Sequence, residues 1–320
     1  MIRLLIVAAG LATSMVASAS AQEWPAKPIR VIVPVGVGSG PDIVPRIVLD
    51  RVGQQIGQTF VFENRPGAGT TTGTAAVARA EADGYTLLAT SSSIATAPSL
   101  YQNMPYNTTK DLAGIAQFGA LPMTLIVNPD GPFKSVAELV AFAKGGQRPL
   151  NFATTGVGSS PHFAAERFRI SAGFQAAQVP FKSSAESMTE IVAGRIDYCF
   201  CPVGNSIELI RSGKLRSLAV STPNRVQAMA DVPTTTELGF KNSDYDPWVG
   251  LLAPRGTPRP IMERLAREIG LAMKESNVAS RLTPNGILPT DLTLHAFDAL
   301  IAKEIEVNAE IAKSISLRPS

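Results

Sequence analysis

Short hydrophobic runs alternate with amphipathic stretches along most of this chain. In the first example, residues 29–50, β-branched and apolar residues are followed by glycines, and Ile43 and Ile47 then stand at helical spacing. This pattern predicts a strand, a loop and a helix. Asp42 stands where a capping carboxylate would accept backbone N–H groups, and Pro41 fits a turn leading into that cap.

The same order of elements recurs directly afterwards. Residues 59–63 predict a strand, residues 64–69 a turn rich in Asn, Pro and Gly, and the Ala-rich run from Thr72 a helix. An apolar strand follows, ending near Ser91. Strands and helices in alternation predict a mainly parallel sheet with helices on both faces.

A second unit of this kind begins near residue 150. Its apolar strand runs to Ala153, its loop holds Gly156 and Gly158, and its helix starts at about Ser160, with Pro161 well placed in the first turn. Two such units predict two α/β lobes, each with a glycine loop before a helix. The first N–H groups of a helix suit an anion, although a tight turn alone also requires glycine.

Other glycine and serine patterns leave alternatives open. Gly36, Gly38 and Gly40 alternate and do not follow the spacing of a dinucleotide-binding loop. The serines at 91–93 fall at the carboxyl end of a strand, where ligands bind in such sheets, but serines there also start a helix, here near Ile94.

The N-terminus has the pattern of an export signal. Arg3 gives a positive start, an apolar run follows, and Ala19-Ser20-Ala21 forms a cleavage site, so we expect removal after about Ala21. No later stretch reaches the roughly 18 apolar residues of a membrane span. We therefore expect an exported, soluble protein in the periplasm.

Composition narrows the function further. The 320 residues carry 29 basic and 26 acidic side chains without a block of like charge, and 6% are aromatic, so we expect no nucleic-acid partner. Cys199 and Cys201 are predicted to be two thiols or a labile bond, because a bridge across so few residues would be strained. The two histidines, His162 and His295, fit no zinc pattern, so neither a metal nor another cofactor is expected.

A set of motifs in order along the chain then points to a family. They include WPAKPIRVIVPVGVGSGPDIVPRI, ENRPGAG, ADGYTLLATSSS, PSLYQNMPYNTTKDL, LNFATTGVGSSPHF, AGRIDY, SGKLRSLAVST, DVPTTTELG and WVGLLAPRGTP. Together they resemble the Bug-type substrate-binding proteins of tripartite tricarboxylate transport systems. The likeness covers essentially the whole chain after the export signal.

The resemblance implies a two-lobed periplasmic binding-protein fold of type II, with crossover strands, that closes on a ligand. It implies one lobe from residues 22–124 and 250–320, and another from residues 125–249. It also implies a small organic carboxylate as ligand and a membrane permease as partner, and we expect a monomer. In the family, backbone N–H groups, hydroxyls and ordered water from two glycine loops hold the carboxylate. Those loops correspond here to residues 35–40 and 154–159.

The resulting candidates come mainly from these loops and from the ends of neighbouring strands. His162 could instead be packed or hydrogen-bonded locally, and Phe181 and Trp248 could stack on an aromatic acid or simply fill the core. The candidate ligand-binding residues are Val35, Gly36, Val37, Gly38, Ser39, Gly40, Ser91, Ser92, Thr154, Thr155, Gly156, Ser159, His162, Phe181 and Cys201.

Three departures from the family pattern qualify this expectation. Pro41 replaces a hydroxyl residue of the first loop, Val37 replaces a proline, and Cys201-Pro202 stands where the family often has an Asp–Asn-like pair. A missing carboxylate there removes a partner for an amino group. We therefore expect a ligand without one.

Two other functions are alternatives to this one. An exported hydrolase is disfavoured because the chain has no GxSxG elbow and only two histidines to act as a base. A sensor that presents its ligand to a membrane kinase would have the same binding fold, and the sequence does not separate it from an uptake protein.

Overall fold

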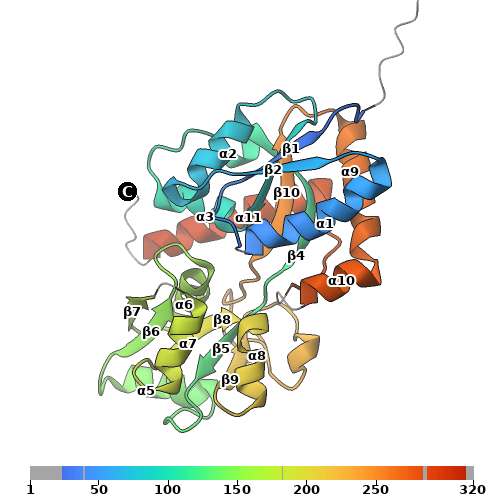
Figure 1. The fold of residues 1–320 in the computed structure, drawn as a ribbon. Coiled ribbons are helices and arrows are strands. Elements are labelled where there is room, and N and C mark those ends of the chain that lie inside the picture. Colours follow the sequence, from blue (N-terminus) through green and yellow to red (C-terminus); the bar gives the residue numbers. More distant parts are fainter. Residues whose placement is uncertain (1–23, 39, 182, 284–286, 315–320) are drawn as a thin grey trace, which may run out of the picture.

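The computed structural model describes residues 24–38, 40–181, 183–283 and 287–314. Their strands form two five-stranded sheets, each covered by helices, which appear as two stacked lobes in Figure 1. In sheet order, the first lobe contains β2 (Phe60–Asn64), β1 (Ile29–Val33), β3 (Thr86–Ser91), β10 (Trp248–Pro254) and β4 (Leu112–Ala120). The second lobe contains β7 (Ala176–Pro180), β6 (Leu150–Thr154), β8 (Tyr198–Pro202), β5 (Met123–Val127) and β9 (Arg216–Val220).

Helices connect and cover these strands. Those of the first lobe are α1 (Gly40–Ile56), η1 (Ala68–Thr70), α2 (Thr71–Ala78), α3 (Ser93–Leu100), α4 (Thr108–Asp111), α9 (Arg259–Met273), α10 (Ser276–Leu282) and α11 (Leu294–Ser314). Those of the second lobe are α5 (Val136–Gly145), α6 (Ser160–Ala172), α7 (Ser184–Val192), α8 (Val203–Arg211) and η2 (Gln227–Met229).

The predicted strand–loop–helix units are confirmed. β1 pairs in parallel with β2 and β3, and β6 pairs in parallel with β7 and β8. The carboxyl ends of these strands therefore lie at one edge of each sheet, where the glycine loops follow β1 and β6. Helix α6 begins at Ser160, with Pro161 in its first turn as expected.

Each sheet also contains strands that run the other way. β10 is antiparallel to β3 and β4, and β5 is antiparallel to β8 and β9, so both sheets are mixed. The chain crosses between the sheets twice, between β4 and β5 and between β9 and β10. The lobe boundaries proposed from the sequence, at 124/125 and 249/250, fall inside β5 and β10 and stay a prediction.

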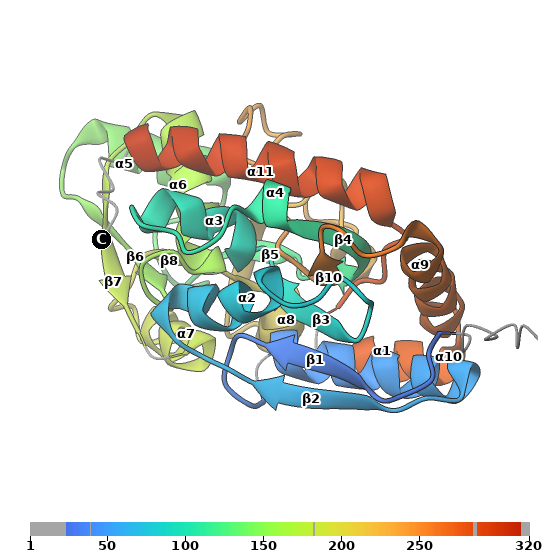
Figure 2. The same cartoon turned by 90° about the horizontal axis from the view of Figure 1, so that it is seen from above.

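Helix α11 is a third link between the lobes. Figure 2 shows it running along one side of the molecule, past α3 and toward α6. It contacts both helices, and Ile311 near its end packs in the hydrophobic core of the second lobe. Relative motion of the lobes must therefore be compatible with this contact.

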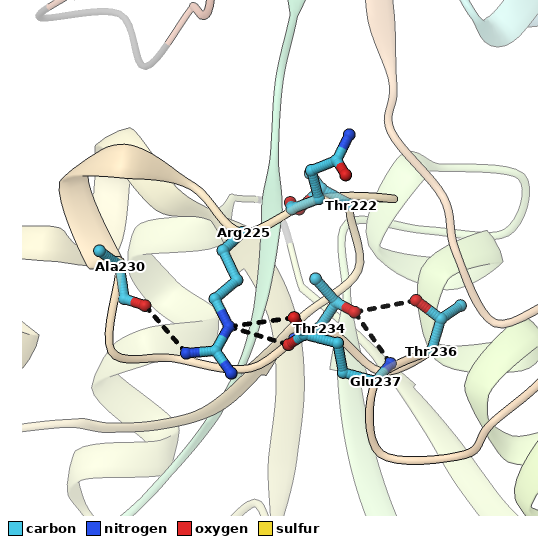
Figure 3. A network of polar contacts seen from close by, with 7 residues as sticks. Thr222, Arg225, Ala230, Thr234, Thr236 and Glu237 are labelled. Atoms are coloured by element: carbon cyan, nitrogen blue, oxygen red, sulfur yellow. Dashed lines mark hydrogen bonds and ion pairs between the residues drawn. The ribbon is translucent and has the colours of Figure 1, made fainter.

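The return segment, residues 221–247 between β9 and β10, is held by its own polar contacts (Figure 3). Arg225 forms an ion pair with Glu237 at 2.9 Å and donates to the carbonyl of Ala230. The backbone N–H of Glu237 donates to the hydroxyl of Thr234 at 3.0 Å. These bonds shape the segment internally, and backbone hydrogen bonds of Val220 with Pro233 and Thr235 join it to β9 of the second lobe.

The predicted export segment and its cleavage site after about Ala21 lie outside the described residues. Within the described residues, no helix combines the length and apolar character needed to cross a lipid bilayer.

Candidate functional site

The first glycine loop is tied to the first turn of α1. Gly38 has φ +86°, a conformation that favours glycine, and its N–H donates to the Asp42 carboxylate at 2.9 Å. The predicted acceptance of a backbone N–H by Asp42 near the helix start is confirmed, but the predicted boundary is wrong: α1 begins at Gly40, so Asp42 and Pro41 lie within it. The carboxylate still accepts a loop N–H, but from inside the helix.

Asp42 is an almost fully buried charge with three polar partners. It accepts hydrogen bonds from Arg46 Nε and from Asn64 Nδ2, both at 2.9 Å, as well as from Gly38. Burial by itself raises the pKa of Asp42, but these hydrogen bonds and the charge of Arg46 outweigh it and leave the pKa below its usual value. The carboxylate is therefore ionised at neutral pH and balanced by Arg46.

The outer part of the first loop is open. Val37 is 80% exposed, and a Cβ built on Gly36 or Gly40 would meet nothing within 4 Å. Val35 packs against the first-lobe core, and its carbonyl accepts from Asn64 at 3.0 Å. The remaining candidate of this loop, Ser39, lies outside the described residues.

The serines after β3 have different surroundings. The Ser91 hydroxyl lies 3.0 Å from that of Ser93, where α3 begins. This confirms the prediction of a helix start near Ile94. Ser92 is buried, its N–H donates to the carbonyl of Trp248, and its hydroxyl lies 3.4 Å from the hydroxyl of Tyr245.

The second glycine loop makes many bonds within itself. The buried Thr154 hydroxyl accepts from Gln178 at 2.8 Å and from the Gly156 N–H at 3.2 Å. Gly156 has φ +115°, and its carbonyl accepts the Ser159 hydroxyl at 2.7 Å. The loop is thus shaped in advance, with Thr155 half-buried beside it and α6 starting directly after Ser159.

His162 is hydrogen-bonded to the second glycine loop. Its Nδ1 accepts the N–H of Gly158 at 3.2 Å, so Nδ1 carries no proton in this arrangement. The ring is buried and stacks on Phe152. Burial lowers the pKa of His162, which keeps the imidazole neutral near pH 7. His162 is therefore packed and hydrogen-bonded locally, which is the alternative to a ligand contact that the sequence left open.

The second loop also touches the first lobe. A Cβ built on Gly158 would collide with the side chain of Leu100 at the end of α3. Glycine at 158 is therefore favoured by its φ of +80°, and a Cβ there would also displace the end of the Leu100 side chain.

The side chains of three other candidate residues, Phe181, Cys201 and Trp248, lie in or against hydrophobic cores. Phe181 packs against a second-lobe cluster that contains Cys199 and Cys201. The two cysteines, both buried, form a disulfide, so the expectation of two thiols is wrong and the alternative of a bond is the one observed. Trp248 is fully buried against Phe297 in the first lobe.

The sequence analysis missed a buried group that joins the lobes, here called the interlobe polar cluster: Arg167, Tyr245, Glu304 and Asn308. Arg167 of α6 donates to Asn308 of α11 at 2.9 Å, and its guanidinium lies 4.6 Å from the ring centre of Tyr245. Glu304 of α11 accepts the indole N–H of Trp248. No motif marks these residues, because they come from three distant segments.

The structure also contains a cavity beside the candidate residue Cys201 at the end of β8. The cavity has a volume of about 670 Å³ and lies between the lobes, with Val203 and Ile207 of α8 on one side and Ala279 of α10 and Leu288 on the other. It begins where β8 ends in Pro202, although the Cys201 side chain itself is buried in the disulfide. In the described part of the chain, no group of three His, Cys, Asp or Glu side chains could hold a metal ion.

A family model described as the tripartite tricarboxylate transporter family receptor matches residues 44–317. Protein BugT of Bordetella pertussis is 34% identical over 307 residues, which cover 95% of this chain and 93% of BugT.

Two solved structures show the same fold with ligands. MatC from Rhodopseudomonas palustris, solved with bound malate, has a TM-score of 0.73 at 27% identity and covers 90% of this chain and 100% of its own. An R. palustris protein solved with adipate has a TM-score of 0.77 at 27% identity, covering 93% and 100%.

Proposed function

The chain belongs to the tripartite tricarboxylate transporter receptor family, and from that premise we propose that it binds a small carboxylic acid between its lobes and delivers it to a membrane permease of the tripartite tricarboxylate type. It is a periplasmic solute-binding protein and not an enzyme, so the hydrolase alternative is wrong. Malate and adipate, the ligands of two structural neighbours, are both dicarboxylates and set the class of acid to test first.

One observation carries the proposal for this chain: the start of α6 lies against the first lobe. Gly158 approaches Leu100 at the end of α3, and Ser92, just before α3, contacts Tyr245 of the return segment. The second glycine loop therefore faces α3 of the first lobe, the helix that follows β3. An acid placed there would meet hydroxyls and helix N–H groups from both lobes, which form charge-assisted hydrogen bonds with a carboxylate.

The two loops contribute differently to this site. In the first loop, the charge at the start of α1 is already balanced, because Asp42 accepts the Gly38 N–H and pairs with Arg46. In the second loop, the partners of Gly156 and Gly158 are the neutral groups Thr154 and His162. We therefore assign the main anion contact to the second loop, where no carboxylate of the protein competes with the ligand.

A thermal-shift titration of the purified protein with malate and adipate tests the binding step. A ligand at a hundred times its dissociation constant adds about 2.7 kcal/mol to the free energy of unfolding, which is a readily measured shift. Malamide, the uncharged diamide of malate, is the matched control and should give no shift. Failure of malate, adipate and a wider panel of carboxylic acids to raise the melting temperature would contradict the proposal.

The delivery step has its own test. Deleting the gene should abolish uptake of the radiolabelled acid that the titration identifies, and the wild-type gene should restore it. Unchanged uptake in the deletion strain would refute delivery while leaving the binding step intact.

A further inference from the structure

Tyr245 lies in the return segment, and its backbone is fixed to the second lobe. Its N–H donates to the carbonyl of Ser221, and the Ser221 hydroxyl donates to the carbonyl of Tyr245, both at 2.6 Å. Ser221 follows β9 directly. Tyr245 is therefore held by the second sheet although it stands close in sequence to β10 of the first.

The orientation of the Tyr245 ring is also fixed. Phe163 of α6 lies with its ring centre 6.4 Å from that of Tyr245, and the guanidinium of Arg167 lies 4.6 Å from the ring centre. Arg167 is itself held, because it donates to the carbonyl of Asp244 at 2.6 Å and to Asn308. A buried ring between such neighbours keeps its hydroxyl in one place.

That hydroxyl contacts the residue before the first helix turn of α3. It lies 3.4 Å from the hydroxyl of Ser92, which directly precedes α3 in the first lobe. Tyr245 is only 2% exposed. Burial raises the pKa of Tyr245 to about 12, so the phenol keeps its proton and can donate to the Ser92 hydroxyl or accept from it.

We propose that Tyr245 is a positioning residue: its ring and backbone are fixed to the second lobe, and its hydroxyl holds the start of α3 in the first lobe at a fixed spacing from the second. The inference rests on the proposed function in one respect, since that spacing sets how the second glycine loop faces the first lobe around a bound acid. Without the hydroxyl, Ser92 loses this partner in the second lobe. The lobes then sample a wider range of separations, and a ligand that needs both lobes must restrict them at a cost in affinity.

Tyr245→Phe removes only the hydroxyl, and Tyr198→Phe is the matched control. Tyr198 lies in the same lobe, is fully buried, and has a hydroxyl without a hydrogen-bond partner among the described residues. The two variants therefore make the same chemical change in similar surroundings. Ser92→Ala removes the first-lobe partner and provides a second, independent disruption of the same contact.

The first measurement needs no ligand. Nitroxide labels on cysteines introduced at Val61 in β2 and Val192 in α7, which are 51% and 42% exposed, report the distance between the lobes by pulsed electron resonance. The native cysteines are paired and buried and will not react. We expect a broader distance distribution in Tyr245→Phe and in Ser92→Ala, and the wild-type distribution in Tyr198→Phe.

The second measurement is the affinity for malate by calorimetry. We expect binding about five-fold weaker in Tyr245→Phe, the effect of losing one neutral hydrogen bond, and unchanged in Tyr198→Phe. If the distance distributions of Tyr245→Phe and Ser92→Ala equal that of wild type, the positioning role is wrong. The distance measurement does not depend on malate binding, so its failure is distinct from a failure of the proposed function, which would appear as absent binding in the wild-type protein.

Discussion

The indole N–H of Trp248 donates to the Glu304 carboxylate at 2.9 Å, which fixes this buried acid of the interlobe polar cluster against β10. Burial, the largest cause, raises the pKa of Glu304 to about 7, and the charge of Asp246 raises it further, while Trp248 and Arg167 lower it. Burial likewise raises the pKa of Asp246 to about 7. Glu304 thus lies within the electrostatic influence of both Asp246 and the buried Arg167.

This arrangement predicts that stability decreases as the pH rises toward 7. The folded protein keeps the Glu304 proton up to about pH 7, whereas an unfolded glutamate loses it near 4.5. Within that window the folded state binds more protons, so the free energy of unfolding should fall by about 1.4 kcal/mol per pH unit for each such group. Denaturant unfolding from about pH 4.5 to about pH 8 measures this slope.

Glu304→Gln should make the slope shallower, because the amide keeps an acceptor for Trp248 but does not titrate. Glu310→Gln, an exposed change on the same helix, is the control and should leave the slope as in wild type. Equal slopes in Glu304→Gln and wild type would show that Glu304 is not the titrating group.

Asp42 provides a prediction on stability. Asp42→Asn removes the charge that holds Arg46 and weakens the bond to the Gly38 N–H, so we expect a loss of about 1–3 kcal/mol in the free energy of unfolding. Asp50→Asn on the same helix is the control, because Asp50 is exposed and lies 3.8 Å from Arg281, and exposed pairs contribute about 0–1 kcal/mol. Urea unfolding compares the two, and similar losses in both would contradict a special role for Asp42.

The sequence predicts the strand and the helix on either side of the first glycine loop. It also predicts that the Asp42 carboxylate accepts a backbone N–H, but not that Arg46 and Asn64 bind the same carboxylate. A buried run followed by glycines and an amphipathic stretch predicts β1 and α1 because local patterning determines both. The partner Asn64 lies at the end of the neighbouring strand β2, and only the parallel register of β1 with β2 brings it to Asp42. Long-range partners of this kind leave no local pattern.

Strand β4 shows a different limit. Its residues, LAGIAQFGA, are all buried and mix small with large side chains, so no alternation of polar and apolar positions marks them as a strand. Gly114 and Gly119 leave room for Phe297 and Ile287, which pack where a Cβ would stand. Tyr245 was missed for a related reason, since its proposed role depends on Ser92 and on Arg167 of α6, which come from two other segments.

The second glycine loop provides a prediction on binding. Gly156 has φ +115°, where an L-residue is strained, so Gly156→Ala should distort the loop at a cost of about 1–3 kcal/mol and weaken malate binding at least ten-fold. Gly213→Ala is the matched control: it also has a positive φ, +72°, and open space at the Cβ, but it follows α8 away from the loop. Calorimetry with malate compares them, and equal affinities would exclude the second loop as the anion contact.

The last prediction concerns the amino group of the ligand. At the end of β8, where the family pattern often has an Asp–Asn-like pair, the chain has Cys201, whose sulfur is bonded to Cys199, followed by Pro202. Neither residue offers a negative charge. A buried ammonium without a partner loses its hydration and gains no interaction that replaces it, so its burial weakens binding.

Malate and aspartate have the same carbon skeleton and differ at one position, where malate has a hydroxyl and aspartate an ammonium. We therefore expect malate to bind at least ten-fold more tightly than aspartate in parallel calorimetric titrations, and succinate, which lacks both groups, to bind more tightly than aspartate as well. Tighter binding of aspartate would show that another acid of the cleft takes the place of the missing one.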